Sequence, residues 1–503
     1  MLAWTIYISF LGAVIALLVP SRKATWVRML ALATTIATCA IATVSFAENR
    51  SGEMLTVTQM PWIPSLGIEY HLAADGISLG LVLLTGIIGI AGVLFSWNID
   101  QRVNEFFFFY LLLVGSVYGV FLSYDLFLLF VFYEIVIIPK YFLIAIWGST
   151  RREYGAMKLV LYSFVGSALV LIGLIAAFVA AGSKSMSLGY LANCPFPLHF
   201  QMWAFPLVFV GFAILAGLWP FHTWAPTGHV AAPTAASMLL AGVVMKLGAY
   251  GCLRVSMTLF PLGMGAWGFH VFGFGSLRDV FAVLGVIGIV YGALVALVQK
   301  DFKFVIGYSS VSHMGFILLG LMTLNQIGIS GAVLQMVSHG LLAGLLFGVV
   351  GRMVYARTHT RELALLGPMN LNKIIPFAAV TFVIAGMASM GLPGFSGFVA
   401  ELMILVGVWH SYPMLACFVG LGIVIGVAYI WRAMQQAFFA ERGATTAEPH
   451  EPLLPISLPE KLGAAILIGA SIVVGIYPQL LLKVITPALG SPLFEGLRTG
   501  RWQ

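Results

Sequence analysis

The sequence predicts an all-α protein that crosses a membrane many times. Hydrophobic residues make up 61% of its 503 residues and charged residues only 9%, whereas soluble domains carry about 25% charged residues. Apolar stretches long enough to cross a bilayer as a helix recur along almost the whole chain. We therefore expect a multi-pass protein that works within the lipid bilayer. The net charge of +7 is spread over many loops, so we expect no nucleic-acid partner.

About fourteen spans satisfy the criteria of length and apolarity. They are expected near residues 2–20, 27–46, 77–97, 105–120, 123–147, 156–182, 202–220, 232–256, 277–299, 303–323, 327–352, 373–410, 413–438 and 461–483. The segment 373–410 is longer than one span needs. It is interrupted at Gly391-Leu392-Pro393-Gly394, and this interruption predicts a broken helix.

The stretch from Gly217 to Gly251 also departs from the pattern of an ordinary membrane helix. Pro220, Pro226 and Pro233 each remove a backbone donor, so we expect no straight helix to run through them. Unpaired backbone groups at membrane depth are tolerated only inside protein or beside a water-filled cavity. The stretch therefore predicts a polar site near the middle of the bilayer.

Two broken helices, one in each half of the chain, are typical of transporters built from inverted repeats. We assign residues 105–256 (spans 4–8) to the first repeat and residues 277–440 (spans 9–13) to the second. Residues 1–104 then hold three N-terminal helices. Residues 441–503 hold a polar linker (441–460), the last span and a C-terminal tail.

Lysine and arginine residues are distributed unevenly between the loops. When Lys303 and Arg254 are counted as loop residues, the loops after odd-numbered spans hold fifteen of them and the other loops hold four. Because positive residues favour the cytoplasmic side, both termini are expected to face outward. An even number of spans agrees with this orientation.

Few ionisable residues are expected deep within the spans. They are Glu134, Lys140, Lys246 and Glu401, and Arg432 lies near enough to a helix end to reach the interface. A buried charge costs several kcal/mol and usually marks a function. Burial favours the neutral form of both amines and carboxyl groups, so Glu134, Lys246 and Glu401, joined by water, would form a proton relay. The alternative is a set of structural ion pairs that fix the helix register.

Four histidines lie in or beside spans: His222, His229, His313 and His339. Imidazole exchanges protons near neutral pH, which makes them candidate members of the relay. The alternatives are neutral histidines bonded to backbone or water, and haem ligation by a histidine pair. The sequence gives no two of them the arrangement expected of haem ligands on facing helices. The four cysteines have no metal-binding or redox spacing, so we interpret them as packing residues and expect no metal site.

Six motifs along the chain are recognisable. They are YHLAADGISLGLVLLTG (70–86), FYEIVIIPKYFLIAIWG (132–148), WPFHTWAPTGHVAAPTAASMLLAGVVMKLGAYG (219–251), IGYSSVSHMG (306–315), QMVSHGLLAGLLF (335–347) and GLPGFSGFVAELMIL (391–405). With these motifs in this order, the chain resembles the antiporter-like membrane subunits of respiratory complex I over nearly its whole length. The resemblance implies a fourteen-helix, proton-translocating subunit of the membrane arm.

The resemblance also implies partners and a location. NADH, FMN, iron–sulfur clusters and quinone would be bound by partner subunits, and this chain would hold no cofactor. Its neighbours would be other membrane-arm subunits, and it would lie in a bacterial inner membrane with both termini on the periplasmic side. Glu134 resembles the family's glutamate on the fifth helix, Lys246 the lysine of the eighth and Glu401 the glutamate of the twelfth. The four histidines also occupy family histidine positions.

Three departures from the family pattern stand out. Leu215 replaces a lysine that usually pairs with the glutamate of the fifth helix, and Thr227 replaces a residue that is more often Asp. Lys140 stands where an apolar residue is commoner. We hypothesise that Lys140 supplies the cation that Leu215 lacks. Six residues beyond Glu134 is not the same face of a regular helix, but Pro139 lies between them and can kink the segment.

The function that these observations favour is proton translocation within a complex I-type enzyme. One alternative is a subunit of a multi-subunit cation/proton antiporter or of a membrane-bound hydrogenase. Another is a non-pumping scaffold, which the loss of the usual lysine at Leu215 leaves open. A third is a haem-bearing membrane oxidoreductase.

Overall fold

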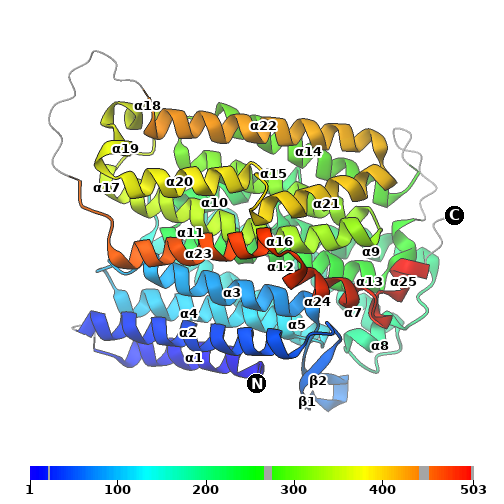
Figure 1. The fold of residues 1–503 in the computed structure, drawn as a ribbon. Helices are drawn as coiled ribbons and strands as arrows, with labels where there is room; N and C mark the ends of the chain where they lie inside the picture. The colour runs from blue at the N-terminus through cyan, green and yellow to red at the C-terminus, as the bar shows by residue number, and fades with distance from the viewer. Residues whose placement is uncertain (21–22, 266–274, 441–452, 500–503) are drawn as a thin grey trace.

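The computed structural model describes residues 1–20, 23–265, 275–440 and 453–499. Its helices run side by side in a thick bundle, seen along its flank in Figure 1. Among the described residues, twelve helices are long and apolar enough to cross a membrane. The shorter apolar helix Ala3–Leu18 and the pair Pro376–Ser389 and Ser396–Ser411 account for the other two predicted spans. The prediction of a multi-pass helical membrane protein is confirmed.

The elements have the following bounds. In the first half they are α1 (Ala3–Leu18), α2 (Ala24–Glu48), β1 (Leu55–Ile63), β2 (Ile68–Ala74), α3 (Gly76–Phe95), α4 (Val103–Leu122), α5 (Leu126–Ile135), α6 (Ile137–Trp147), α7 (Arg152–Ala180), α8 (Leu188–Ala192), α9 (Leu198–Ala216), α10 (Trp224–Ala231), α11 (Thr234–Leu239), α12 (Met245–Gly251) and α13 (Met257–Leu259). In the second half they are α14 (Leu277–Val298), α15 (Phe302–Met322), α16 (Gln326–Gly348), α17 (Ala356–Thr358), α18 (Leu363–Leu366), α19 (Leu371–Ile374), α20 (Pro376–Ser389), α21 (Ser396–Ser411), α22 (Pro413–Phe438), α23 (Leu458–Ile476), α24 (Gln479–Leu489) and α25 (Glu495–Thr499). Short 3₁₀ turns are η2 (Pro64–Leu66), η3 (Phe221–Thr223), η6 (Pro261–Met264), η8 (Gly367–Met369) and η9 (Pro492–Phe494).

Both predicted helix breaks are present. The first follows α9, which ends where Gly217 adopts φ +81°. The second separates α20 from α21, where Gly391 and Gly394 adopt φ +76° and +98°. A positive φ of this size is available to glycine at little cost, so these glycines let the chain turn inside the bundle.

One expectation at the first break is wrong. We expected Pro226 to interrupt any helix, but α10 runs through it. Pro226 is the third residue of α10, where a backbone N–H has no partner within the helix in any case. Pro233, in contrast, does precede the restart of the span at Thr234, as predicted.

The span that restarts at Thr234 contains two π-helical stretches that the sequence did not predict. They are η4 (Leu240–Val244) and η5 (Cys252–Ser256), and a third, η7 (Val349–Tyr355), follows α16. In a π-helix the backbone bond reaches one residue further than in an α-helix, and such stretches are frequent at functional sites. Here η4 directly precedes α12, which carries Lys246.

The prediction of an all-α chain missed a small hairpin. Strands β1 and β2 pair antiparallel in the loop between the second and third spans. Figure 1 places the hairpin at the end of the bundle where α8 and α25 also lie. Residues 441–452 of the predicted polar linker lie outside the described residues.

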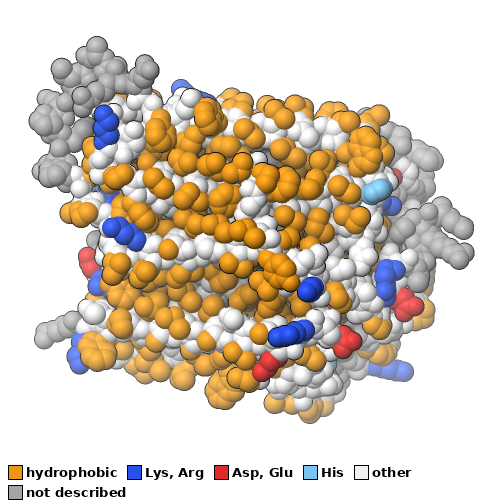
Figure 2. Space-filling model, in the orientation of Figure 1, with side chains coloured by type: hydrophobic (Ala, Val, Ile, Leu, Met, Phe, Trp, Pro, Cys, Tyr) orange, Lys and Arg blue, Asp and Glu red, His pale blue; other side chains and the backbone are white. Residues whose placement is uncertain are grey.

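Burial is very uneven between the spans. Over their most apolar eighteen residues, Thr234–Leu259 and Gln326–Thr358 are wholly buried within the bundle, whereas the corresponding stretches of α22 and α2 are 28% and 33% buried. Figure 2 shows a broad apolar band along the flank, with charged side chains gathered toward the two ends. The two wholly buried spans carry Lys246 and His339, so these ionisable residues lie far from lipid.

Candidate functional site

Lys246 lies at the centre of the candidate site. It is fully buried, and its ammonium donates to the carbonyl oxygen of Ala241 in the preceding π-helical stretch. The same nitrogen lies 2.8 Å from Nδ1 of His339 on α16. Because η4 offers its Ala241 carbonyl to the ammonium, the local helix geometry itself holds the lysine in place.

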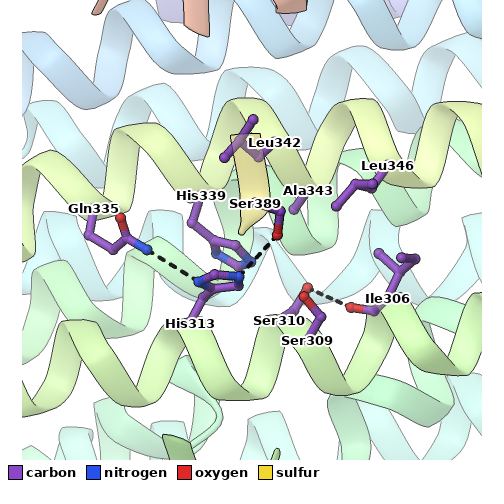
Figure 3. Close-up of a pocket in the computed structure, with 10 residues that line it drawn as sticks. All are labelled: Ile306, Ser309, Ser310, His313, Gln335, His339, Leu342, Ala343, Leu346 and Ser389. Atoms are coloured by element: carbon purple, nitrogen blue, oxygen red, sulfur yellow. Dashed lines mark hydrogen bonds between the residues drawn. The ribbon is translucent and has the colours of Figure 1, made fainter. Parts of the chain in front are cut away.

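His339 and His313 bring α16 and α15 into contact. Their ring centroids are 5.2 Å apart and the ring planes are inclined by 30°. Figure 3 shows His313 reaching between Gln335 and Ser389, with the His339 ring beside it. Nε2 of His313 lies 3.2 Å from the Ser389 hydroxyl, and Nδ1 lies 3.3 Å from the Gln335 amide nitrogen.

Glu401 completes the series from the second broken helix. Its Oε1 lies 3.2 Å from Nδ1 of His313 and 3.4 Å from the amide nitrogen of Gln335. A Cβ added at Gly391 would lie 3.1 Å from Oε2, so the carboxylate rests against the helix break. Lys246, His339, His313 and Glu401 thus form one buried series that joins α12, α16, α15 and α21.

A small cavity lies beside this series. Ser309, Ser310, His313, His339 and Ser389 help to line it, and its volume is about 10 Å³. That is roughly the space that one water molecule needs, and the polar lining offers it hydrogen-bond partners. The cavity therefore provides a site for a water beside two imidazoles that make no direct hydrogen bond to each other.

Glu134 has very different surroundings. It occupies the last turn of α5, which ends at Ile135. The helix is interrupted there because Pro139 has no N–H to donate to the Ile135 carbonyl. Oε1 of Glu134 is buried without a hydrogen-bond partner, as is the hydroxyl of the adjacent Tyr133. Among the described residues, no cation lies within 4.0 Å of the Glu134 carboxylate.

Lys140 is buried on α6 and donates to the hydroxyl of Ser163 on α7, at 3.0 Å. Its ammonium interacts electrostatically with Glu134 across more than ion-pair distance. It therefore points into protein and away from lipid. Leu215 is buried near the end of α9. Its backbone packs against Gly248 of α12, where an added Cβ would meet the Leu215 carbonyl carbon at 3.0 Å.

The two histidines of the first break differ from the central pair. His222, in η3, is buried, and its ring contacts those of Tyr291 and Tyr308. His229, in α10, is fully buried, with Nε2 at 3.4 Å from the sulfur of Met245. His229 therefore lies next to the residue that precedes Lys246. His222 makes no contact with the series.

Comparison with known proteins places this arrangement in a family. Residues 123–426 match the family described as NADH:quinone oxidoreductase/Mrp antiporter, TM. The NADH-quinone oxidoreductase subunit M of Rhodobacter capsulatus is 36% identical over 93% of this chain and 90% of its own length. The chain belongs to this family. NAD(P)H-quinone oxidoreductase chain 4 1 of Synechococcus sp. (strain JA-2-3B'a(2-13)) is 34% identical, over 96% of this chain and 91% of its own.

Solved structures show the same fold. A chain of respiratory complex I from Thermus thermophilus with bound NADH matches with a TM-score of 0.87 and 25% identity, covering 99% of this chain and 100% of that one. A chain of the Mrp complex from Dietzia sp. DQ12-45-1b matches with a TM-score of 0.85 and 20% identity, over 100% and 98% of the two chains. The second likeness is one of fold alone. The antiporter-like family resemblance inferred from the motifs is confirmed.

Lys303 is an ionisable residue of this antiporter-like chain that the sequence placed wrongly. We counted it as a loop residue, but it is buried in the first turn of α15. Its ammonium donates to the carbonyl oxygens of Val230 and Ala232, at 3.2 and 2.6 Å. A cation is favoured at a helix C-terminus, where carbonyl groups lack partners. Lys303 therefore fixes the end of α10, two residues beyond His229.

Arg254 was also wrongly counted among the loops. It lies inside the span, in η5, and its guanidinium forms a buried ion pair with Asp75, at 2.5 Å. Asp75 also caps α3 by accepting from the backbone of Ile77 and Ser78. The hydroxyl of Tyr250 accepts from Arg254, at 3.2 Å. The sequence did not predict this ion pair, because Arg254 lies close to the end of its span and an arginine there usually reaches the headgroups.

Proposed function

We propose that this chain is a proton-translocating membrane-arm subunit of an NADH:quinone oxidoreductase, equivalent to subunit M. The observation that carries the proposal is the buried series Lys246–His339–His313–Glu401. Four buried ionisable side chains within membrane-spanning helices cost several kcal/mol each. A fold that only had to be stable would gain from apolar residues there.

The contacts give each group of the series a role. The Lys246 ammonium is placed to give a proton to Nδ1 of His339, which then releases the proton on Nε2 toward the cavity. A water in the cavity passes a proton to Nε2 of His313, within the reach that proton transfer requires. His313 then gives up its Nδ1 proton to Oε1 of Glu401.

Gln335 makes the last transfer depend on the state of His313. When Nδ1 is protonated it donates to Glu401, and when Nδ1 is bare it accepts from the Gln335 amide, because both partners lie within 3.4 Å. Glu401 therefore holds the imidazole in the first state and Gln335 holds it in the second. Glu401, which also accepts from Gln335, is the store of the proton at the end of the series.

The first half is proposed to feed this series. Glu134 would exchange protons with Lys140, which takes over the part of the cation missing at Leu215. His229 and His222 would serve as further relay groups on the side of the first break. The groups of the first half are less closely connected than those of the second, and the two halves meet at Lys246.

The proposal extends to the rest of the assembly. Oxidation of NADH and reduction of quinone would take place in partner subunits that hold FMN and iron–sulfur clusters, and this chain would supply no redox group. Its partners would be the neighbouring antiporter-like subunits of the membrane arm. We infer a bacterial inner membrane with both termini on the periplasmic side, because the basic loops lie at the opposite end of the spans.

Replacing Lys246 by Met in the assembled complex tests the proposal. We expect normal assembly, a lower ratio of protons pumped to electrons transferred in vesicles, and a quinone reductase rate reduced about tenfold, equivalent to about 1.4 kcal/mol. The control is Lys483→Met, because Lys483 is exposed on α24 and, among the described residues, donates only to the Tyr477 hydroxyl. An unchanged proton-to-electron ratio in a fully assembled Lys246→Met complex would identify the chain as a scaffold.

A second candidate is a subunit of a cation/proton antiporter, which the fold of the Mrp complex supports. Co-purification decides between them. A quinone-reducing peripheral arm that co-purifies with the chain supports the respiratory enzyme, and hydrogenase or antiporter subunits support the alternative. A haem-bearing oxidoreductase would give visible absorption bands in the purified chain, and we expect none.

A further inference from the structure

An open cavity of about 580 Å³ lies at the surface of the molecule, apart from the series of ionisable residues. Lys300, at the junction of α14 and α15, forms one wall, and Arg432 and Gln436 on α22 form another. Glu362 and Pro368 lie on the third side, near α18. Figure 1 places α18 and α19 at the end of the bundle opposite the hairpin, which we call the basic end because the lysine- and arginine-rich loops lie there.

Among the described residues, the two cations of this cavity have no acidic partner within 4.0 Å. Lys300 is exposed, and the structure gives its ammonium no hydrogen bond to any described residue. Arg432 is half-buried and uses its guanidinium to bond the carbonyl oxygen of Leu297. Glu362 lines the same cavity, yet among the described residues no carboxylate lies within 4.0 Å of either cation. Two unpaired cations around an open space suit a ligand with a negative charge.

A donor on the same helix face adds to the site. Gln436 follows Arg432 by four residues on α22, so the two side chains lie one above the other on one face. The amide of Gln436 can donate to an oxygen that both cations attract. A phosphate group, with several acceptor oxygens, matches a site made of an arginine, a lysine and an amide.

Exposed apolar side chains lie on α14 and α22, close in sequence to Lys300 and Arg432. On α14, Val298 is 67% exposed and Leu294 is 47% exposed. On α22, Trp431 is 52% exposed and Phe439 is 48% exposed. The two helices pack against each other. Exposed apolar side chains beside a charged cavity suit a ligand with a polar head and long acyl chains.

We propose that this cavity binds the phosphate group of an anionic phospholipid, whose acyl chains lie along α14 and α22. Anionic lipids are enriched on the cytoplasmic side, and basic pockets between helices at that level recognise their headgroups. The site does not depend on proton translocation, so it can fail or succeed independently of the proposed function. The positive charges of Lys300 and Arg432 make the site prefer anionic over zwitterionic lipid.

The test compares lipid retained by the purified complex. The complex is equilibrated with vesicles of equal parts phosphatidylglycerol and phosphatidylcholine, and the bound phosphatidylglycerol is then measured by native mass spectrometry. We expect Lys300→Gln to weaken binding of phosphatidylglycerol about fivefold, the usual effect of one cation near an anionic surface. Lys300 is exposed, so this change leaves the fold intact. Arg432→Gln should weaken binding further.

Two controls sharpen the result. Glu362→Gln removes the one carboxylate among the described lining residues and should strengthen binding, which a general loss of structure does not do. Lys23→Gln with Arg151→Gln removes two cations from other loops of the basic end and should leave binding unchanged. Inorganic phosphate alone should not displace the lipid; if it does so at millimolar concentration, the site is one for free phosphate. Equal retention in Lys300→Gln and the unaltered complex would overturn the proposal.

Discussion

The two carboxylates of the proposed relay, Glu134 and Glu401, have opposite surroundings. Glu401 has two partners within 3.4 Å, and through His313 it is connected to a cavity and to Lys246. Among the described residues, Oε1 of Glu134 has no hydrogen-bond partner, and Lys140 interacts with this carboxylate only from beyond ion-pair distance. Glu134 lies beside the interruption between α5 and α6, and Glu401 lies beside the break between α20 and α21. Only the break between α20 and α21 contains glycines that bring a backbone turn against the carboxylate.

The comparison teaches that an interrupted helix is not enough to make a connected site. In the second half, α15 and α16 each supply a histidine to the same point, and Gln335 joins that point to Glu401. In the first half, Leu215 stands where the family pattern has a lysine, and its aliphatic side chain offers no proton. In the proposed relay, Glu134 would therefore exchange protons through Lys140, which donates to Ser163, and this would be the less connected half.

Glu401→Gln should have the largest effect among changes outside Lys246. The amide is nearly the same size and still accepts from Gln335, but it cannot take a proton from His313. We expect proton pumping to fall about tenfold, equivalent to about 1.4 kcal/mol, while NADH oxidation by the peripheral arm with an artificial acceptor stays normal. Pumping and acceptor reduction measured on the same vesicles separate these effects. Full pumping in the variant would remove Glu401 from the relay.

Lys140→Met should have the next largest effect, and a double variant makes it specific. Alone, it removes the cation that acts on Glu134, and we expect pumping to fall about fivefold, equivalent to about 1 kcal/mol. Adding Leu215→Lys restores a cation on the other side and should recover part of the loss. A double-mutant cycle measures this coupling.

The cycle has its own control. Leu215→Lys by itself buries a longer, charged side chain against α12, so its cost is measured separately in the thermal stability of the purified complex. If the double variant pumps no better than Lys140→Met after that correction, Lys140 does not replace the missing lysine. The first half would then have lost the function of the usual lysine without a replacement.

Much of this contrast was visible in the sequence, because membrane spans depend on length and apolarity alone. The spans, both breaks and the ionisable residues at 134, 246 and 401 were all found without a structure. The contacts that join these residues could not be predicted from the sequence. The bond from Lys246 to His339 joins residues 93 positions apart, and no periodicity within one helix predicts which neighbour a side chain meets.

Other features escaped for different physical reasons. A π-helical stretch such as η4 has no composition of its own, since it differs from an α-helix only in the reach of its hydrogen bonds. Arg254 and Lys303 stand close to span ends, where free and buried cations look alike in sequence. The hairpin β1–β2 is short and lies in a loop, where no long apolar run marks it.

A pair of glycine variants compares the two breaks directly. Gly217→Ala and Gly391→Ala both place an L side chain at a positive φ, and each should lower stability by about 1 kcal/mol. At Gly217 the new methyl meets the flexible end of Met245, whereas at Gly391 it meets Oε2 of Glu401. We therefore expect similar losses in thermal stability, but reduced pumping only for Gly391→Ala. Equal pumping in the two variants would contradict a role for the second break in placing the carboxylate.

Ser389→Ala should have the smallest effect. It removes the hydrogen bond to Nε2 of His313, and a single bond of this kind contributes about 1 kcal/mol or less, so we expect pumping to fall about twofold to fivefold. Ser310→Ala is the matched control, because Ser310 lines the same cavity but bonds back to Ile306 in its own helix. If Ser310→Ala lowers pumping as much as Ser389→Ala, the cavity rather than the bond sets the rate. Glu401 and Gln335 would then be enough to hold the imidazole of His313 in position, and the hydrogen bond from Ser389 would add nothing to the relay.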